Sequence, residues 1–347
     1  MSEIKVNSIK GVSATSAAIS INNTDGTCTA NITNNLSNRN LIINGAMQVA
    51  QRATSSTANG YVSLDRWYVN QSGGSTTFSQ ETNSNPSETT DIQKFARLNV
   101  SSSSDYTSIR QRIEDVTKVP SGTVTLSFYA KGTAPAGGLY VFTTQDFGTS
   151  GSSDVSGTPV LVTSSLTSSW VRYTAQITIG SVDGKTIGAG SFLQVNIGQY
   201  TNTSSTAYDL NITGVQLEVG SVATDFEHRS FAQELELCKR YFQVVGESGK
   251  FSGHVAYYRN TSVEMQVAFF PEMRAIPTFT ATSGSNYYYF YRQTTFDVFN
   301  AWTDLGSMGA KGGAVYSSES DVAVTDTGIA GAIYFNTGAQ LFFNAEL

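Results

Sequence analysis

The sequence predicts an all-β protein built from an extended N-terminal stem, a β-sandwich, a short helix and a C-terminal β domain. Only 14% of its residues are charged, against about 25% in typical globular chains. The chain is instead rich in Thr, Val, Tyr and Phe, which favour strands. Strand-length apolar runs recur along most of its 347 residues, and clusters of Gly, Ser, Asn and Thr with turn composition separate them.

Residues 1–40 are expected to form the stem. Their aliphatic residues come in short alternating runs, among them Ile4, Val6, Ile9, Ile19 and Ile21. Such a segment has too little apolar surface to close a core alone. We therefore expect an extended or intertwined stem whose strands pair with neighbouring chains, and the alternative is a disordered arm.

Residues 41–229 are expected to form a jelly-roll sandwich, because strand-length runs alternate with loop-like segments at the spacing typical of that fold. Val124, Leu126 and Phe128 should face one way along their strand, toward a core. The expected strands are 95–100, 124–130, 139–143, 170–179, 192–197 and 208–219. In the fourth, the face expected to be apolar is Val171, Tyr173, Ala175, Ile177 and Ile179.

Residues 230–245 break the β pattern and predict a helical connector. Ser230 can cap the helix, because Gln233 follows at capping-box spacing. One side of the helix should be apolar, with Phe231, Leu235, Cys238, Tyr241 and Phe242. The other side should carry Glu234, Glu236, Lys239 and Arg240. We expect the apolar stripe to rest on the sandwich or to meet two further copies around a three-fold axis.

Residues 246–347 return to strand patterns and predict a second, smaller β domain at the tip. The expected strands are 254–258, 262–270, 278–282, 287–291, 313–317 and 329–336.

Composition narrows the function classes. The net charge is −6 and no basic stripe is visible, which argues against nucleic acid as a partner. No apolar run is long enough to span a bilayer, and the first ten residues lack the apolar core of a signal peptide. Cys28 and Cys238 are the two cysteines; we expect Cys238 to be a small core residue, and a disulfide between the two is the alternative.

Three segments carry a resemblance to a known family. They read LIINGAMQVAQRATSSTANGYVSLDRW at 41–67, LNITGVQLEVGSVATDFEHRSFAQELELCKRY at 210–241 and VAFFPEMRAIPT at 267–278. The first two resemble the opening and closing of the jelly-roll, carbohydrate-binding-module-like sandwich of bacteriophage tail-fibre and appendage proteins of the marine phage type. The third resembles the junction that follows the helix in the same family. The resemblance covers residues 41–245 closely and the rest loosely.

The resemblance implies a virion appendage protein made in the host cytoplasm, most simply a homotrimeric tail fibre that binds a host-surface glycan or protein receptor during adsorption. The stem would then be the end that docks onto other tail or virion proteins. Two rival functions stay open: a head, neck or tail-nozzle decoration protein without a receptor role, and a polysaccharide depolymerase. No enzymatic activity, cofactor or membrane insertion is expected.

Polysaccharide hydrolysis would need two carboxylates flanking a sugar. Adjacent Glu114 and Asp115 would point to opposite faces of a strand, which rules them out as a pair by themselves. The other acidic candidates are Asp183, Asp209, Glu218 and Glu264. His228 and His254 are expected to be structural or solvated, and no metal-ligand spacing is present, although a single structural calcium held by separate loops would escape detection.

The strongest candidate for binding is an aromatic cluster at 287–302. It joins YYYFYR at 287–292 to Phe296, Phe299 and Trp302. Flat aromatic rings suit the C–H faces of sugars, and we expect receptor contacts from Tyr287, Tyr289, Tyr291, Arg292 and Trp302. The alternative places Tyr288 and Phe290 in a core, with the remaining tyrosines outside or at a subunit contact.

Overall fold

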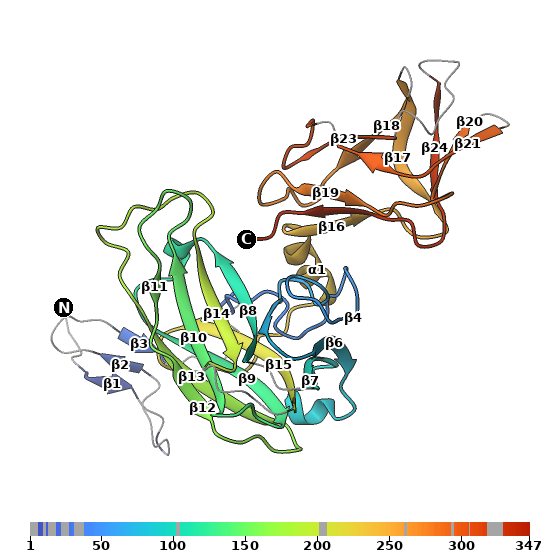
Figure 1. The fold of residues 1–347 in the computed structure, drawn as a ribbon. Helices are drawn as coiled ribbons and strands as arrows, with labels where there is room; N and C mark the ends of the chain where they lie inside the picture. Colours follow the sequence, from blue (N-terminus) through green and yellow to red (C-terminus); the bar gives the residue numbers. More distant parts are fainter. Residues whose placement is uncertain are drawn as a thin grey trace.

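The computed structural model confirms an all-β architecture (Figure 1). It describes residues 6–9, 12, 19–21, 28–30, 38–101, 105–200, 207–259, 262–292, 295–304, 306–317 and 329–347. The side chains of residues 28–30, 253–255 and 257–259 are not described, so the expectations for the His254 side chain, and for Ile4 and part of the stem, lie outside the described residues.

A jelly-roll sandwich occupies residues 38–230. Within the described residues, each of its two antiparallel sheets has six strands. The first sheet has the order β11-β10-β14-β8-β5, and β12 also pairs with β10. Its strands are β5 Tyr68–Ser72, β8 Tyr106–Glu114, β10 Leu139–Asp146, β11 Val155–Ser156, β12 Val160–Thr163 and β14 Phe192–Gly198.

The second sheet has the order β13-β9-β15-β7-β6-β4. Its strands are β4 Ser55–Ser56, β6 Thr76–Thr82, β7 Lys94–Val100, β9 Gly122–Gly132, β13 Val171–Ile179 and β15 Tyr208–Val219. Two short 3-10 helices, η1 Pro86–Thr89 and η2 Val116–Lys118, lie in the described loops. All six strands expected from sequence in this region are present.

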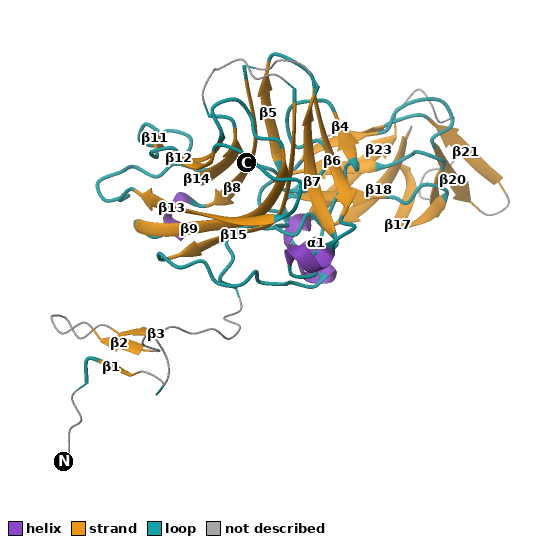
Figure 2. Cartoon of the chain, turned by 90° about the horizontal axis from the view of Figure 1, so that it is seen from below, coloured by secondary structure: helices purple, strands orange, loops and turns teal. Residues whose placement is uncertain are grey.

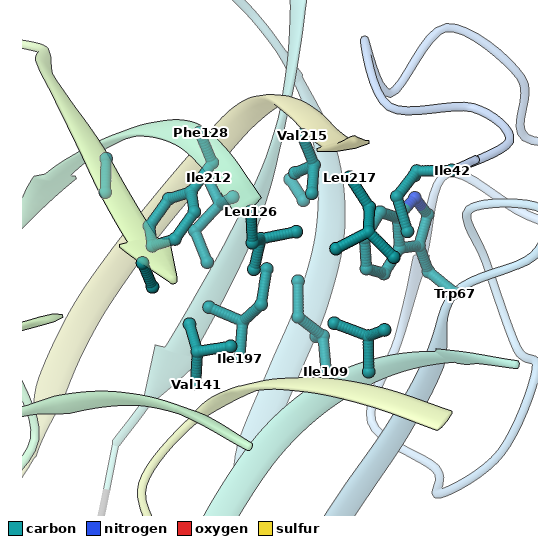
Figure 3. Packing of buried hydrophobic residues seen from close by; sticks show 14 of the residues in the cluster. Ile42, Trp67, Ile109, Leu126, Phe128, Val141, Ile197, Ile212, Val215 and Leu217 are labelled. Atoms are coloured by element: carbon teal, nitrogen blue, oxygen red, sulfur yellow. The ribbon is translucent and has the colours of Figure 1, made fainter. Parts of the chain in front are cut away.

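The apolar faces of both sheets meet in one core (Figure 3). Leu126 and Phe128 of β9 pack there with Ile109, Val141 and Ile197 from the opposite sheet. In β9 the side chains alternate between this core and the outer face, although Thr125 and Ser127 on the outer face are buried as well. The prediction of alternation is thereby confirmed for β9.

The opening motif anchors the same core. Trp67 is 1% exposed, and its indole N–H donates to the carbonyl oxygen of Asn44 at 3.0 Å. Arg66, also buried, is paired with Glu346. Adjacent residues of the opening motif thus supply a buried ring and a buried ion pair.

In β13 the expected apolar face is only partly buried. Ala175, Ile177 and Ile179 lie in the core, whereas Val171 is exposed. Val171 starts the strand, where its neighbour Trp170 packs against Phe95 instead. An edge strand buries its apolar face only as far as the opposing sheet reaches.

The connector holds the one α-helix among the described residues, α1 Phe231–Lys239, and the expected capping box of Ser230 and Gln233 is present. The helix is shorter than expected: residues 242–245 form strand β16 (Phe242–Val245), which pairs with the C-terminal domain. The expected helix faces were wrong at two positions. Phe231 is exposed. Glu234 is buried, and its carboxylate is satisfied there by the backbone amide of Asn44 at 2.7 Å and by Arg229 at 3.5 Å.

The C-terminal domain, residues 242–347, packs two antiparallel sheets around a second core (Figure 1). In the described part of the chain its large sheet has seven strands in the order β21-β20-β24-β17-β18-β23-β22, and its small sheet has three in the order β16-β25-β19. The strands are β17 Lys250–Arg259, β18 Ser262–Ala268, β19 Thr278–Ala281, β20 Tyr288–Arg292, β21 Thr295–Phe299, β22 Trp302–Thr303, β23 Gly312–Ser317, β24 Ala330–Phe335 and β25 Leu341–Asn344.

The described part of the stem is a small sheet, β1-β2-β3 (Ser8–Ile9, Ile19–Ile21 and Cys28–Ala30), drawn apart from the sandwich in Figure 2. Ile9 of β1 is 52% exposed and Val6, which precedes the strand, is 41% exposed, so aliphatic side chains of the described stem are uncovered. No helix among the described residues is long and apolar enough to cross a membrane.

Candidate functional site

Alternation along β20 divides the aromatic cluster between two faces of the large sheet. Tyr288 and Phe290 are 0% exposed and lie in the C-terminal core. Phe299 of β21 stacks on Tyr288 with ring centroids 5.4 Å apart, and Trp302 packs edge-on against both rings. This half of the cluster is structural, as the core alternative predicted.

The other half lies on the outer face of the same sheet. Tyr289 and Tyr291 of β20 gather there with three rings from neighbouring strands. We call this set the outer aromatic platform: Phe251, Tyr289, Tyr291, Phe296 and Tyr334. Its ring centroids lie 5.2 to 6.3 Å apart, and Phe251, Phe296 and Tyr291 are 55%, 48% and 37% exposed.

Strand pairing explains how residues far apart in sequence meet on this platform. Tyr334 of β24 stands directly opposite Tyr289 of β20 on one side and opposite Phe251 of β17 on the other. Tyr291 of β20 pairs directly with Phe296 of β21. Directly opposed residues share a face of an antiparallel pair, so these rings form two adjoining rows.

Of the five residues expected to contact a receptor, the structure brings only Tyr289 and Tyr291 together. Trp302 is 6% exposed and belongs to the core, so its place in a receptor surface was wrong. Arg292 lies on the same face of β20 as the core residues Tyr288 and Phe290, at the end of the strand, and its Nε donates to Asp297 Oδ2 at 3.1 Å. Tyr287 is half-buried against the edge of the core, with its ring centroid 6.4 Å from that of Tyr288.

Burial raises the pKa of two groups on the inner side of the sheet that carries the platform. The pKa of Tyr288 is raised, mainly by desolvation, and its hydroxyl donates to the carbonyl oxygen of Thr282 at 2.6 Å. Burial also raises the pKa of Asp297 beside Arg292. The hydroxyls available on the platform itself are those of its three tyrosines.

A hollow of about 370 Å³ borders the platform at Phe251. Its wall continues along β16 at Val244 and Val245 and ends at Phe270, which is 79% exposed. Exposed aromatic side chains therefore extend beyond the platform toward the small sheet. Apolar surface gathered in this way on a soluble protein marks a contact site.

A second candidate surface lies on the outer face of the first sandwich sheet. One row of directly paired residues crosses four strands there: Tyr68, Arg110, Asn196 and Phe142. The Arg110 guanidinium lies 4.1 Å from the centroid of the Tyr68 ring, and Asn196 Nδ2 donates to the Phe142 carbonyl oxygen at 3.2 Å. We call this row the sandwich row.

Next to the sandwich row, polar side chains bond to one another. Arg112 Nε donates to Gln194 Oε1 at 3.2 Å, and Gln194 Nε2 donates to Asn196 Oδ1 at 3.3 Å. At the other side Tyr200 packs over Tyr140 and Phe142 with centroids 5.8 and 5.2 Å away. The face thus combines rings with planar polar groups. It was not predicted from the sequence, because β5 and β8 were not expected as strands.

The acidic candidates for hydrolysis are engaged elsewhere or scattered. Asp209 forms a bidentate pair with Arg97, and Glu218 accepts from the Thr224 amide at 3.0 Å. These two carboxylates sit at opposite ends of β15, about 30 Å apart at the usual rise per residue. Glu264 lies on β18 in the C-terminal domain and Asp183 in an exposed loop of the sandwich.

Glu114 and Asp115 also have structural partners. Glu114 accepts from Arg240 at 3.1 Å and from the Tyr241 hydroxyl at 3.1 Å. Asp115 caps η2 by accepting the Thr117 amide at 2.7 Å. His228 is exposed and packs edge-on against Phe226. Among the described residues, no group of three or more His, Cys, Asp and Glu side chains has the arrangement of a metal site.

Comparisons with known proteins give structural neighbours but no family. No family model matches the chain, and no curated protein matches it. The chain is similar to the enzymatically active domain of tailspike protein 4 of bacteriophage CBA120, with a TM-score of 0.31, 11% identity and coverage of 52% of this chain and 21% of that one. It therefore spans about a fifth of that chain's length.

Two further solved structures represent the other kinds of neighbour. The tripod from the baseplate of bacteriophage Tuc2009 gives a TM-score of 0.28 and 15% identity over 72% of this chain and 90% of that one. The family 11 carbohydrate-binding module of cellulosomal cellulase Lic26A-Cel5E of Clostridium thermocellum gives a TM-score of 0.29 and 14% identity. That match covers 51% of this chain and 98% of the module. Because these TM-scores are below 0.5, the function of this chain is inferred from its own residues.

Proposed function

We propose that this chain is a bacteriophage virion appendage protein, a homotrimeric tail fibre whose outer aromatic platform binds a host-surface glycan during adsorption. The observation that carries the proposal is the platform itself: five aromatic rings on the outer face of the large sheet, in the domain remote from the stem (Figures 1 and 2). The phage-like segments at 41–67 and 210–241 support its place in a virion.

The chemistry of the platform suits an extended sugar chain. Ring faces offer apolar contact to the C–H faces of pyranoses, and the hydroxyls of Tyr289, Tyr291 and Tyr334 can donate to or accept from sugar hydroxyls. A shallow surface of this kind gives weak binding at a single site. Three linked platforms raise the avidity by about two to four orders of magnitude when geometry lets them engage together.

The test replaces the two exposed platform rings that are directly paired between β20 and β21. Tyr291→Ala and Phe296→Ala should each reduce binding to host cells or purified surface glycans at least about tenfold, and the double variant should lose it, while the melting temperature stays close to that of the parent. Tyr68→Ala in the sandwich row is the matched control and should bind normally.

Four other outcomes would redirect the proposal. If Tyr68→Ala abolishes binding and the platform variants do not, the sandwich row is the receptor site. If the platform variants dissociate the trimer in light scattering, the rings form a subunit contact instead. If particles carrying them adsorb normally with intact trimers, a decoration role is favoured, and new reducing ends on incubation with host glycans would favour a depolymerase.

The stem is proposed as the virion-docking end. Its described residues Val6 and Ile9 are exposed, which fits strand contacts with neighbouring chains. A protein starting at Asn38 should keep both β domains folded and fail to incorporate into particles. Efficient incorporation of that shortened protein would contradict this assignment.

A further inference from the structure

The described residues form two separate main hydrophobic cores, and the two share no side chain. One contains residues from 42 to 217, and the other contains residues from 256 to 345. The contacts between the two β domains are instead made largely by charged side chains and the rings stacked on them. Figure 1 shows the C-terminus lying between the two bodies, where it reaches the sandwich.

Glu346 makes a buried charged contact between the two bodies. Its carboxylate lies between two arginines of the sandwich's opening motif, 3.3 Å from Arg52 Nη2 and paired through its other oxygen with Arg66 Nη1. The side chains of Glu346, Arg52 and Arg66 are only 4%, 10% and 1% exposed. A carboxylate from the C-terminal domain thus completes a buried ionic cluster of the sandwich.

The arginines are held by rings from the connector. The Arg66 guanidinium lies 3.4 Å from the centroid of the Tyr241 ring, and the Arg52 guanidinium lies 3.6 Å from that of Phe242. Asp65, whose oxygen is 3.6 Å from Arg52, supplies the second negative charge. Two positive and two negative charges therefore balance only while Glu346 is in place.

Backbone contacts hold the last residues in this position. Arg274 donates from Nε to the Ala345 carbonyl oxygen at 2.8 Å, and the Ala345 amide donates to the Tyr241 carbonyl oxygen at 2.8 Å. Arg112 of β8 donates to the carbonyl oxygen of Leu347. The segment 345–347 is thereby fixed to both domains.

We propose that Glu346 is a latch that fixes the orientation of the C-terminal domain on the sandwich, and that its neutralisation releases the C-terminal domain as a separately folded, mobile body. Without the carboxylate, Arg52 and Arg66 stay buried side by side with Asp65 alone. Buried charges without partners are strongly unfavourable, and hydration by opening the junction relieves them. The junction between the two domains can open without breaking a hydrophobic core, because neither main core crosses it.

The experiment compares Glu346→Gln with the parent trimer by electron paramagnetic resonance, which measures the distance between two spin labels on one chain. Labels are placed at Asp183→Cys in the sandwich and Thr280→Cys in the C-terminal domain, two exposed positions. Labelled chains are diluted with unlabelled chains so that only distances within one chain are seen. The parent should give one narrow distance distribution, and Glu346→Gln should give a broad one while both domains keep their amide protection.

A matched control and a second variant keep the test decisive. Glu272→Gln removes an exposed carboxylate 3.9 Å from Lys311 in the same domain and should leave the distribution narrow. Arg52→Met removes one of the two ion pairs of Glu346 from the sandwich side, where it cannot harm the fold of the C-terminal domain directly, and should also broaden the distribution. A narrow distribution in Arg52→Met, or loss of amide protection throughout the C-terminal domain in both variants, would overturn the proposal.

Discussion

The sandwich and the C-terminal domain treat the outer faces of their sheets differently. On the sandwich, outward side chains satisfy one another, as in the bidentate Arg97–Asp209 pair and the Gln194–Asn196 contact. On the large C-terminal sheet, the outward side chains of the platform are aromatic rings that pack mainly against one another, several of them well exposed. Exposed rings contribute little to the stability of the fold, so their gathering on one face indicates that the folded protein makes a contact there.

The largest expected effect separates the two cores. Phe290→Ala should destabilise the C-terminal domain by about 3–5 kcal/mol, because the ring is fully buried and its removal leaves a cavity. Phe128→Ala should do the same to the sandwich. Calorimetry of each variant should show one lowered transition and one unchanged, and a joint shift of both would show that the domains unfold as one unit.

A smaller effect is expected where the connector meets the sandwich. Glu234→Ala should destabilise the sandwich by about 1–3 kcal/mol, since the Asn44 amide and Arg229 lose their buried acceptor. Glu234→Gln keeps an oxygen acceptor and should lose less. Urea unfolding followed by tryptophan fluorescence measures both, and equal losses in the two variants would mean that charge alone matters there.

Alkaline pH should weaken both domains through one buried tyrosine each. Desolvation raises the pKa of Tyr208 in the sandwich and of Tyr288 in the C-terminal domain. A tyrosine in the unfolded chain titrates near pH 10, so the contribution of each to stability is complete below about pH 10 and is lost as the pH rises further. Melting temperatures should fall over that range, and Tyr208→Phe should flatten the fall for the sandwich transition only.

The smallest effect is expected from surface rings. Phe296→Ala on the platform and Tyr68→Ala on the sandwich row should each change stability by about 0.5 kcal/mol or less. If Phe296→Ala instead costs as much as Phe290→Ala, the platform belongs to the fold, and the contrast between inner and outer faces fails. Thermal melts of the purified protein decide between these results.

The sequence predicted strands well wherever apolar residues alternate clearly, as in β9, and it overlooked strands with polar sequences. YTSIRQRIE in β8 carries Thr, Ser, Gln and Arg, although Ile109 and Ile113 alternate into the core. The strand β6, TTFSQET, has one large apolar residue, Phe78. In both strands the pairing with neighbours, rather than local propensity, decides the conformation.

The candidate site was half predictable for a related reason. Alternation correctly separated Tyr288 and Phe290 from Tyr289 and Tyr291. Alternation within one strand cannot place Trp302, because the chain leaves β21 at Phe299 and begins a new strand beside β23. Nor can it find Phe251 and Tyr334, which join the platform through pairings between strands far apart in the sequence.

The start and the end of the sandwich lie side by side. The Asn40 amide donates to Glu227 Oε2 at 2.8 Å, and Arg229 bonds to the Asn40 and Ile42 carbonyl oxygens just before α1 begins. A pulling force between the stem and the C-terminal domain would therefore run directly from residue 40 to residue 229. The strands of the sandwich would lie outside that line of tension, so the chain can bear load without shearing its largest domain.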